Sequence, residues 1–206
     1  MNALSALTLI LLLAEPAEDK GWELAADRDG LKVYAREKKG TGVQEMTAKG
    51  LIDAPPEAVW KTIRDYEAYT KTMPYIRESR ILEREGGDKV IYLYSIVSAP
   101  LVDWRDYVIK LVDESQWKDG QGFLKVTWST SNDRAPKKPD GMVRVEINDG
   151  YWKLEPRENG TKTFATYYLF TDPGGSLPKW LVNRANGTAV PDVFSHVRKN
   201  AKNASK

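Results

Sequence analysis

Most of the chain shows the alternation of apolar and polar positions that is typical of half-buried strands. The alternation is clearest over 31–36, where Leu31, Val33 and Ala35 are apolar, and over 105–112. Glycine-containing turns separate several of these segments, which predicts antiparallel neighbours joined by short connections. The further predicted strands cover 44–52, 75–83, 89–97, 122–130, 142–154 and 161–171.

Helical spacing replaces the alternation in two places. The run Asp53-Ala54-Pro55-Pro56-Glu57 has the cap and proline chemistry of a helix start, and the predicted helix ends before Pro74. A longer helix follows the turn at 172–176, whereas residues 21–30 predict a short helix that ends in a turn at Asp29-Gly30. This order of elements predicts the α+β class, with helices packed on one face of a strongly bent antiparallel sheet.

The final helix combines a wide apolar face with two asparagines inside it. Its apolar residues fall within one half of a helical wheel and are Val182, Ala185, Ala189, Val190, Val193, Phe194 and Val197. Asn183 and Asn186 lie in the same arc, and an amide buried without a partner costs about 1–3 kcal/mol. Each amide must therefore find a backbone, side-chain, water or ligand partner. The helix either closes a core or covers a cavity.

Two arginines lie at positions where the alternation predicts a buried face. The apolar residues that share the face of Arg105 are Tyr107, Ile109 and Leu111. Because buried charges are usually paired, we expect a structural ion pair between Arg105 and a carboxylate, with a polar ligand group as the alternative partner. In the 142–154 segment, Arg144 has the same parity as Trp152, unless a bulge shifts the register.

The composition narrows the class of function. The 206 residues are 41% hydrophobic, enough for one folded domain, and the seven Trp and ten Tyr suit a mixed cavity. The net charge of +2 is spread along the chain without the basic stripe of a nucleic-acid-binding protein. A single histidine, His196, and the absence of cysteine argue against a zinc site, and the sequence has no Gly-x-Ser-x-Gly motif for a hydrolase triad. We therefore expect a monomer without catalytic residues, metal or cofactor.

The first twenty residues differ from the rest of the chain. The apolar run from Leu4 to Ala14 is too short to span a membrane and fits the hydrophobic region of a secretory signal peptide, although no Lys or Arg precedes it. We therefore expect residues 1–20 to be a signal peptide and residues 21–206 to form the domain, in a periplasmic or secreted protein. The alternative is an N-terminal helix that packs on the domain of a cytoplasmic protein.

Three segments resemble the START (steroidogenic-acute-regulatory-related lipid-transfer) domain family. The first runs from Pro100 through Arg105-Asp106-Tyr107-Val108, and the second is Gly150-Tyr151-Trp152-Lys153-Leu154-Glu155-Pro156. The third is the turn and helix start at 172–183, Asp-Pro-Gly-Gly-Ser-Leu-Pro-Lys-Trp-Leu-Val-Asn. The similarity covers about residues 22–200, and the order of the predicted elements agrees with that of the family.

The resemblance implies a helix-grip fold, in which a curved antiparallel sheet wraps the long C-terminal helix and leaves an internal apolar cavity for one lipid or sterol-like molecule. Arg105, Arg144 and Asn186 are the expected contacts of the ligand's polar head. The other expected ligand-binding residues are Tyr94, Trp128, Trp152, Tyr167, Val182, Ala189 and Val193. The buried acid–base pair of some sterol-binding members has no counterpart, because the relevant strands carry Tyr92, Lys110 and Leu111.

The resemblance also assigns a gate to the loop at 98–104. Its residues Pro100, Leu101, Val102 and Trp104 are expected to make transient contact with a membrane surface. Two alternatives to lipid transfer or sensing remain. One is an enzyme of the same superfamily, such as a polyketide cyclase or aromatase, and the other is a ligand-gated module that binds a protein partner.

Overall fold

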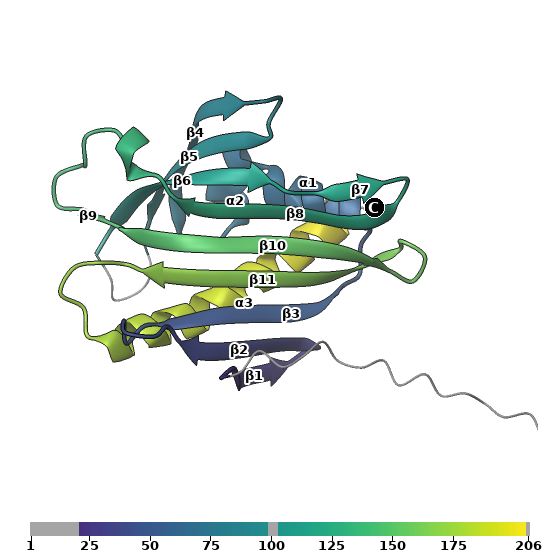
Figure 1. Cartoon of the computed structure of the whole chain (residues 1–206), viewed down its shortest axis with the longest axis horizontal. Helices are drawn as coiled ribbons and strands as arrows, with labels where there is room; N and C mark the ends of the chain where they lie inside the picture. Colours follow the sequence, from purple (N-terminus) through teal and green to yellow (C-terminus); the bar gives the residue numbers. More distant parts are fainter. Residues whose placement is uncertain (1–20, 99–102, 205–206) are drawn as a thin grey trace, which may run out of the picture.

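The computed structural model describes residues 21–98 and 103–204, which form one largely antiparallel sheet, a short helical segment and a long C-terminal helix (Figure 1). The strand order is β1-β2-β3-β11-β10-β8-β6-β5-β4, with β7 paired to β8 and β9 paired to β6. The bounds of the first six strands are β1 Glu23–Arg28, β2 Leu31–Glu37, β3 Gln44–Ile52, β4 Ile76–Glu85, β5 Val90–Val97 and β6 Arg105–Asp113. The others are β7 Gln116–Lys118, β8 Gln121–Thr130, β9 Val143–Arg144, β10 Ile147–Arg157 and β11 Lys162–Asp172.

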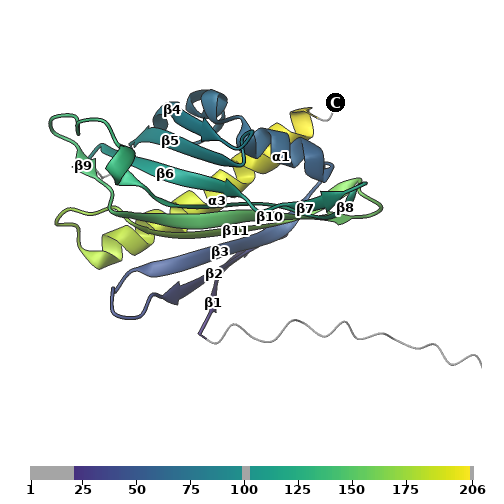
Figure 2. The same ribbon diagram turned by 45° about the horizontal axis from the view of Figure 1, so that its top comes forward.

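Helix α3 (Lys179–Ala204) lies along the concave face of this sheet (Figures 1 and 2). Its residues Val190, Phe194 and Val197 are fully buried in the main core cluster. The expected α+β class and helix-grip arrangement are therefore confirmed. None of the described helices is apolar enough over a sufficient length to cross a bilayer.

A short helical segment closes one end of the concave face. It consists of α1 (Pro56–Arg64), the 3-10 turn η1 (Tyr66–Ala68) and α2 (Tyr69–Thr72). Pro56 occupies the first turn of α1, where its missing N–H costs nothing, and Val59 and Ile63 face the core. Figure 2 shows α1 beside the C-terminal part of α3, in agreement with the contacts between the two helices.

Strand pairing sets which side chains reach the concave face. Trp152 of β10 pairs with Tyr167 of β11, and Leu93 of β5 pairs with Ile109 of β6, so the members of each pair share a face. The alternate residues, such as Tyr168 of β11, lie on the convex face. The concave face therefore carries the apolar set that packs under α3.

Two predictions about local structure are wrong. Residues 21–30 form strand β1 and a turn instead of a helix, because β1 pairs with β2 across Asp29 and Gly30, both at positive φ (53° and 68°). The predicted strand 142–154 is interrupted, since β9 pairs in parallel with β6 before β10 begins. The short strand β7 was not predicted.

Candidate ligand cavity

A cavity of about 240 Å³ lies between the concave face of the sheet and α3. Strand residues that line it include Leu93, Val97, Arg105, Tyr107, Ile109, Leu111, Val126, Trp128, Asn148, Trp152, Tyr167, Leu169 and Thr171. Helix α3 contributes Val182, Ala185, Asn186, Ala189 and Val193, and the α1–β4 segment contributes Ile63, Tyr66, Tyr69, Met73, Pro74, Tyr75 and Ile76. Val145, Pro173 and Leu177 complete the lining. Most of this surface is apolar or aromatic.

Stacked aromatic rings form one wall of the cavity. The rings of Trp152 and Tyr167 are stacked with centroids 4.4 Å apart, and Trp128 lies 6.0 Å from Tyr167. Burial raises the pKa of Tyr107 to about 12 and that of Tyr167 further, so both phenols are neutral at physiological pH. The wall is therefore an uncharged, rigid surface.

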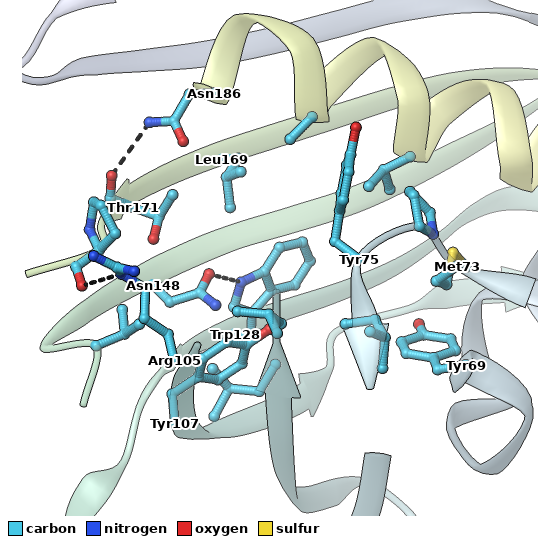
Figure 3. A pocket seen from close by; sticks show the side chains of 18 of the residues that line it. Tyr69, Met73, Tyr75, Arg105, Tyr107, Trp128, Asn148, Leu169, Thr171 and Asn186 are labelled. Atoms are coloured by element: carbon cyan, nitrogen blue, oxygen red, sulfur yellow. Dashed lines mark hydrogen bonds between the residues drawn. The ribbon is translucent and has the colours of Figure 1, made fainter. Parts of the chain in front are cut away.

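Polar side chains gather at one end of the cavity (Figure 3). Asn186 Nδ2 of α3 donates a 3.3 Å hydrogen bond to the carbonyl oxygen of Thr171. Trp128 Nε1 donates a 3.2 Å hydrogen bond to Asn148 Oδ1. Arg105, at the start of β6, lies at the same end. The end where β11 turns into α3 is thus the polar end of an otherwise apolar cavity.

Arg105 is a buried cation that is held by carbonyl groups. Arg105 is only 3% exposed. Nε donates a 3.0 Å hydrogen bond to the carbonyl oxygen of Pro173, and Nη1 donates to that of Asp103. Among the described residues, no carboxylate lies within ion-pair distance of Arg105, so the expected Arg–carboxylate pair is wrong, and the charge of Asp103 acts on the guanidinium only from further away. Burial lowers the pKa of this guanidinium, which nevertheless stays protonated.

Tyrosine and methionine side chains lie toward the other end of the cavity (Figure 3). The hydroxyl of Tyr75 donates a 2.6 Å hydrogen bond to Asp192 Oδ2 of α3, and this bond raises the pKa of Tyr75 to about 12. Tyr75 has a φ of 66°, which is unusual for a large side chain. Tyr69 donates to the carbonyl oxygen of Ile63, and burial raises its pKa well above the ordinary value.

Most residues expected to bind the ligand lie around this cavity. They are Arg105, Trp128, Trp152, Tyr167, Val182, Asn186, Ala189 and Val193. Tyr94 and Arg144 were also expected there but lie outside it, on the convex side of the sheet. Tyr94 pairs with Val108 across β5 and β6, whereas the cavity-lining Leu93 pairs with Ile109.

Arg144 lies on the opposite face from the one predicted because the strand is interrupted between β9 and β10. Val145 and Asn148 both line the cavity although their sequence separation is odd, so the alternation breaks between β9 and β10. Arg144 therefore faces the opposite way from Trp152. Its Nε and Nη2 donate to the two carboxylate oxygens of Asp106, at 3.1 and 2.5 Å.

The two asparagines of α3 have different partners. Asn183 Oδ1 accepts a 2.9 Å hydrogen bond from the backbone N–H of Gln44, and its Nδ2 donates to the carbonyl oxygen of Gly42 at 3.4 Å. Asn183 thus joins α3 to the turn before β3 and does not line the cavity. Asn186 does line it, with its amide nitrogen bonded to Thr171.

The expected gate is only partly within the described residues. Pro100, Leu101 and Val102 lie outside them, and Trp104 is 49% exposed. Val143 donates a 3.1 Å backbone hydrogen bond to Trp104, next to the turn that precedes α3. Trp180, in the first turn of α3, is 66% exposed. Two exposed tryptophans therefore lie at the polar end of the cavity.

Sequence reasoning missed some of the cavity lining. Asn148 shares the parity of Trp152 and could have been found as a polar position on an apolar face. Met73 lies between predicted elements, and Tyr75, the first residue of the predicted strand 75–83, precedes β4 in the structure, so alternation along that strand does not place its side chain. His196 is exposed and its ring contacts the carbonyl oxygen of Asp192. Among residues 21–98 and 103–204, no group of acidic or histidine side chains has the arrangement of a metal site.

The sequence and the fold have clear relatives. The profile of the START domain matches residues 4–206. A STAR-related lipid transfer protein from Xanthomonas axonopodis is 31% identical, with a TM-score of 0.77 over 88% of this chain and 99% of its own. Phosphatidylcholine transfer protein of Bos taurus is 26% identical over 90% of this chain and 86% of its own length. Human StAR-related lipid transfer protein 5, at 18% identity, has the same fold, with a TM-score of 0.81 over 92% of this chain and 90% of its own. The resemblance carried by the three sequence segments is confirmed, and the chain belongs to the START domain family.

Proposed function

We propose that this protein binds one lipid molecule in the cavity beneath α3 and carries it between membranes. The supporting observation is the cavity itself, whose lining is apolar or aromatic apart from a few polar groups at one end. An apolar chain gains about 25 cal/mol for each Å² removed from water, and polar groups at one end fix the ligand's orientation. The names of the relatives, which are lipid transfer proteins, support the same function.

Catalysis on a polyketide in the same cavity has less support. General acid–base catalysis requires a titratable group whose pKa lies near the working pH. Among the described residues that line the cavity, the ionisable side chains are Arg105 and tyrosines. Burial raises the pKa of Tyr66 and Tyr107 to about 12, far above neutral pH. These groups favour binding over proton transfer.

We further propose that the protein meets the membrane through the end that carries Trp104 and Trp180. Both side chains are exposed, and tryptophan is suited to the boundary between lipid and water because it combines an apolar ring with a polar N–H. The apolar loop tip 100–102 lies next to Trp104 in the sequence. Contact at this end brings the turn at 173–178, above the polar end of the cavity, close to the lipid surface.

A transfer assay combined with native mass spectrometry tests the lipid-transfer proposal. Protein purified from its own host is expected to retain one lipid per chain, which extraction then identifies. Donor vesicles labelled with that lipid should lose label to acceptor vesicles faster when the protein is present. A W104S/W180S variant should bind the lipid but transfer it more slowly, because only the membrane contact is changed. Failure of the folded protein to bind or transfer any lipid of its host would contradict the proposal.

We also propose that residues 1–20 are a signal peptide and that the protein acts in the periplasm or outside the cell. The apolar run at 4–14 supports this proposal, and the segment lies outside the described residues. N-terminal sequencing of the protein from its host tests it. A mature chain that starts close to residue 20 is expected, whereas a retained N-terminus in a cytoplasmic fraction would contradict export.

A further inference from the structure

We propose that the ligand carries an anionic oxygen group, a carboxylate or a phosphate, which pairs with Arg105 at the polar end of the cavity. This inference rests on the proposed lipid-binding function and adds the charge of the ligand to it. A neutral sterol or alcohol would leave the guanidinium without a directly bonded anion, whereas an anionic amphiphile would match both ends of the cavity.

The first argument is the charge of the cavity. Arg105 is the sole charged residue among the described residues that line it, and the others are apolar, aromatic or neutral polar. Because the cavity is lined mostly by apolar and aromatic side chains, the attraction between this cation and an anion is screened less than at the protein surface. An anionic group is therefore the ligand chemistry that the cavity favours most.

The second argument is the hydrogen bonding of Arg105. Nε and Nη1 donate to the carbonyl oxygens of Pro173 and Asp103, whereas Nη2 has no partner among the described residues. A guanidinium has five N–H donors and fits a two-oxygen anion well. The two carbonyl bonds fix the orientation of the group, so its remaining donors are set for a ligand before the ligand binds.

The third argument is a comparison with Arg144, a partly buried arginine of the same region. Arg144 is paired with the fully buried Asp106 through two hydrogen bonds. Neither acidic residue near Arg105 accepts a hydrogen bond from it through a carboxylate oxygen, although the charge of Asp103 attracts the guanidinium. Asp172 accepts bonds from the Gly174 N–H and from Lys179 Nζ, each at 3.0 Å, and Asp103 contacts Arg105 through its carbonyl oxygen. Among the described residues, Arg144 thus has a hydrogen-bonded carboxylate partner on the convex side of the sheet, whereas Arg105 in the cavity is held by carbonyl oxygens.

Neutral polar groups beside Arg105 fit a ligand head of small size. Asn148, Thr171 and Asn186 lie at the same end, from β10, β11 and α3 respectively. Asn186 is 7% exposed, and no partner of its Oδ1 is found among the described residues. These groups can bind the hydroxyl or ester atoms next to an anionic group, while the chain extends toward Tyr69 and Met73.

Binding of four single-chain probes tests the charge of the ligand. The volume of about 240 Å³ is slightly below the range of about 300–1,000 Å³ typical of small-molecule sites, so short single chains suit the cavity. The probes are dodecanoate, dodecyl phosphate, 1-dodecanol and dodecyltrimethylammonium, each titrated below its micelle concentration at pH 8 by calorimetry. We expect at least one of the two anions to bind about tenfold or more tightly than the alcohol, since hydrogen bonds to charged groups are the stronger ones. The ratio of the affinities for dodecanoate and dodecyl phosphate distinguishes a carboxylate ligand from a phosphate ligand.

Arg105→Gln should remove this preference, with anion affinity lowered about tenfold and dodecanol affinity changed less than about threefold. Arg198→Gln is the matched control. Burial also lowers the pKa of Arg198, which donates a 3.1 Å hydrogen bond to the Asp29 carbonyl oxygen but does not line the cavity. The control should keep the preference of the wild-type protein. Arg105→Lys, which keeps the charge, should recover part of it.

Two outcomes overturn the inference and leave lipid transfer standing. One is that the wild-type protein binds dodecanol or dodecyltrimethylammonium as tightly as both anions or more tightly. This measurement does not depend on whether a variant folds. The other is failure to bind any of the four probes by protein that still transfers its host lipid between vesicles. Loss of both probe binding and lipid transfer in folded protein would instead overturn the proposed function itself.

Discussion

Arg105 and Asp106 are neighbours in β6, yet their side chains lie on opposite faces of the sheet, and of the two only Asp106 forms an ion pair within the described residues. Arg144 donates to both carboxylate oxygens of Asp106, and Tyr94 donates to Oδ2 at 3.3 Å. Arg144 also donates to the carbonyl oxygen of Pro136 at 2.9 Å. This ion pair therefore attaches the 131–145 segment to the convex face of the sheet, and Arg105 is the one cation among the described residues that line the cavity.

Asp106→Asn should destabilise the fold by about 1.5–3 kcal/mol, because it weakens the charge-assisted hydrogen bonds from Arg144, whose side chain is 21% exposed and keeps contact with water. Urea unfolding monitored by tryptophan fluorescence measures this loss. Replacing the pair together, as in a D106L/R144M variant, should recover much of the stability, since no uncompensated charge remains. A single variant as stable as the wild type would show that the pair is not what holds the segment.

The faces of the regular strands could be predicted from the sequence, but the faces around irregular joints could not. Arg105 was placed correctly, with Tyr107 and Ile109, because β6 alternates without interruption. Arg144 was misplaced because the parallel pairing of β9 with β6 is a long-range contact that no local pattern reveals. Tyr75 was missed for a similar reason, since its position depends on Asp192, which is 117 positions away along the chain.

Alanine substitutions of Asn183 and Asn186 should have different effects, one mainly on stability and the other mainly on ligand affinity. Asn183→Ala removes the bond to the Gln44 N–H and should cost about 1–2 kcal/mol, because a buried backbone donor loses its partner. Ligand affinity should stay within about threefold, since Asn183 does not line the cavity. Asn186→Ala should instead weaken binding. Chemical denaturation and lipid titration of both variants check this, and the reverse pattern would refute the assignment.

Two glycines should respond to alanine in opposite directions. A Cβ on Gly150 would collide with the ring of Trp128 and with the carbonyl oxygen of Tyr168, so Gly150→Ala should destabilise by about 1–3 kcal/mol or more and displace a cavity wall. At Gly187, within α3, the nearest atom to a new Cβ is Met46 Cε at 4.0 Å. Gly187→Ala should therefore stabilise the helix by about 0.5–1 kcal/mol. Thermal unfolding of the two variants measures both changes in stability.

The buried tyrosines predict a loss of stability at alkaline pH. The ordinary pKa of tyrosine is about 10, and burial raises the pKa of Tyr107 to about 12 in the folded protein. The folded state therefore keeps a proton that the unfolded state loses, so this contribution is complete below pH of about 10 and disappears as the pH rises toward 12. Unfolding free energies measured from pH 8 to 12 should fall across that window. Tyr107→Phe should reduce the slope there, and an unchanged slope would exclude Tyr107 as a source.

The hydrogen bond between Tyr75 and Asp192 should control how fast the ligand leaves. It ties the segment before β4 to the middle of α3 across one end of the cavity, and Tyr75 holds a φ of 66° that usually costs about 1–3 kcal/mol. Tyr75→Phe keeps the ring in the lining but removes the tie, so lipid exchange should accelerate severalfold with an affinity change below about threefold. Stopped-flow lipid release measures the rate. Asp192→Asn is the matched variant, because an amide oxygen still accepts the bond, and its rate should lie between the other two. Equal rates for all three proteins would show that this end of the cavity does not limit exchange.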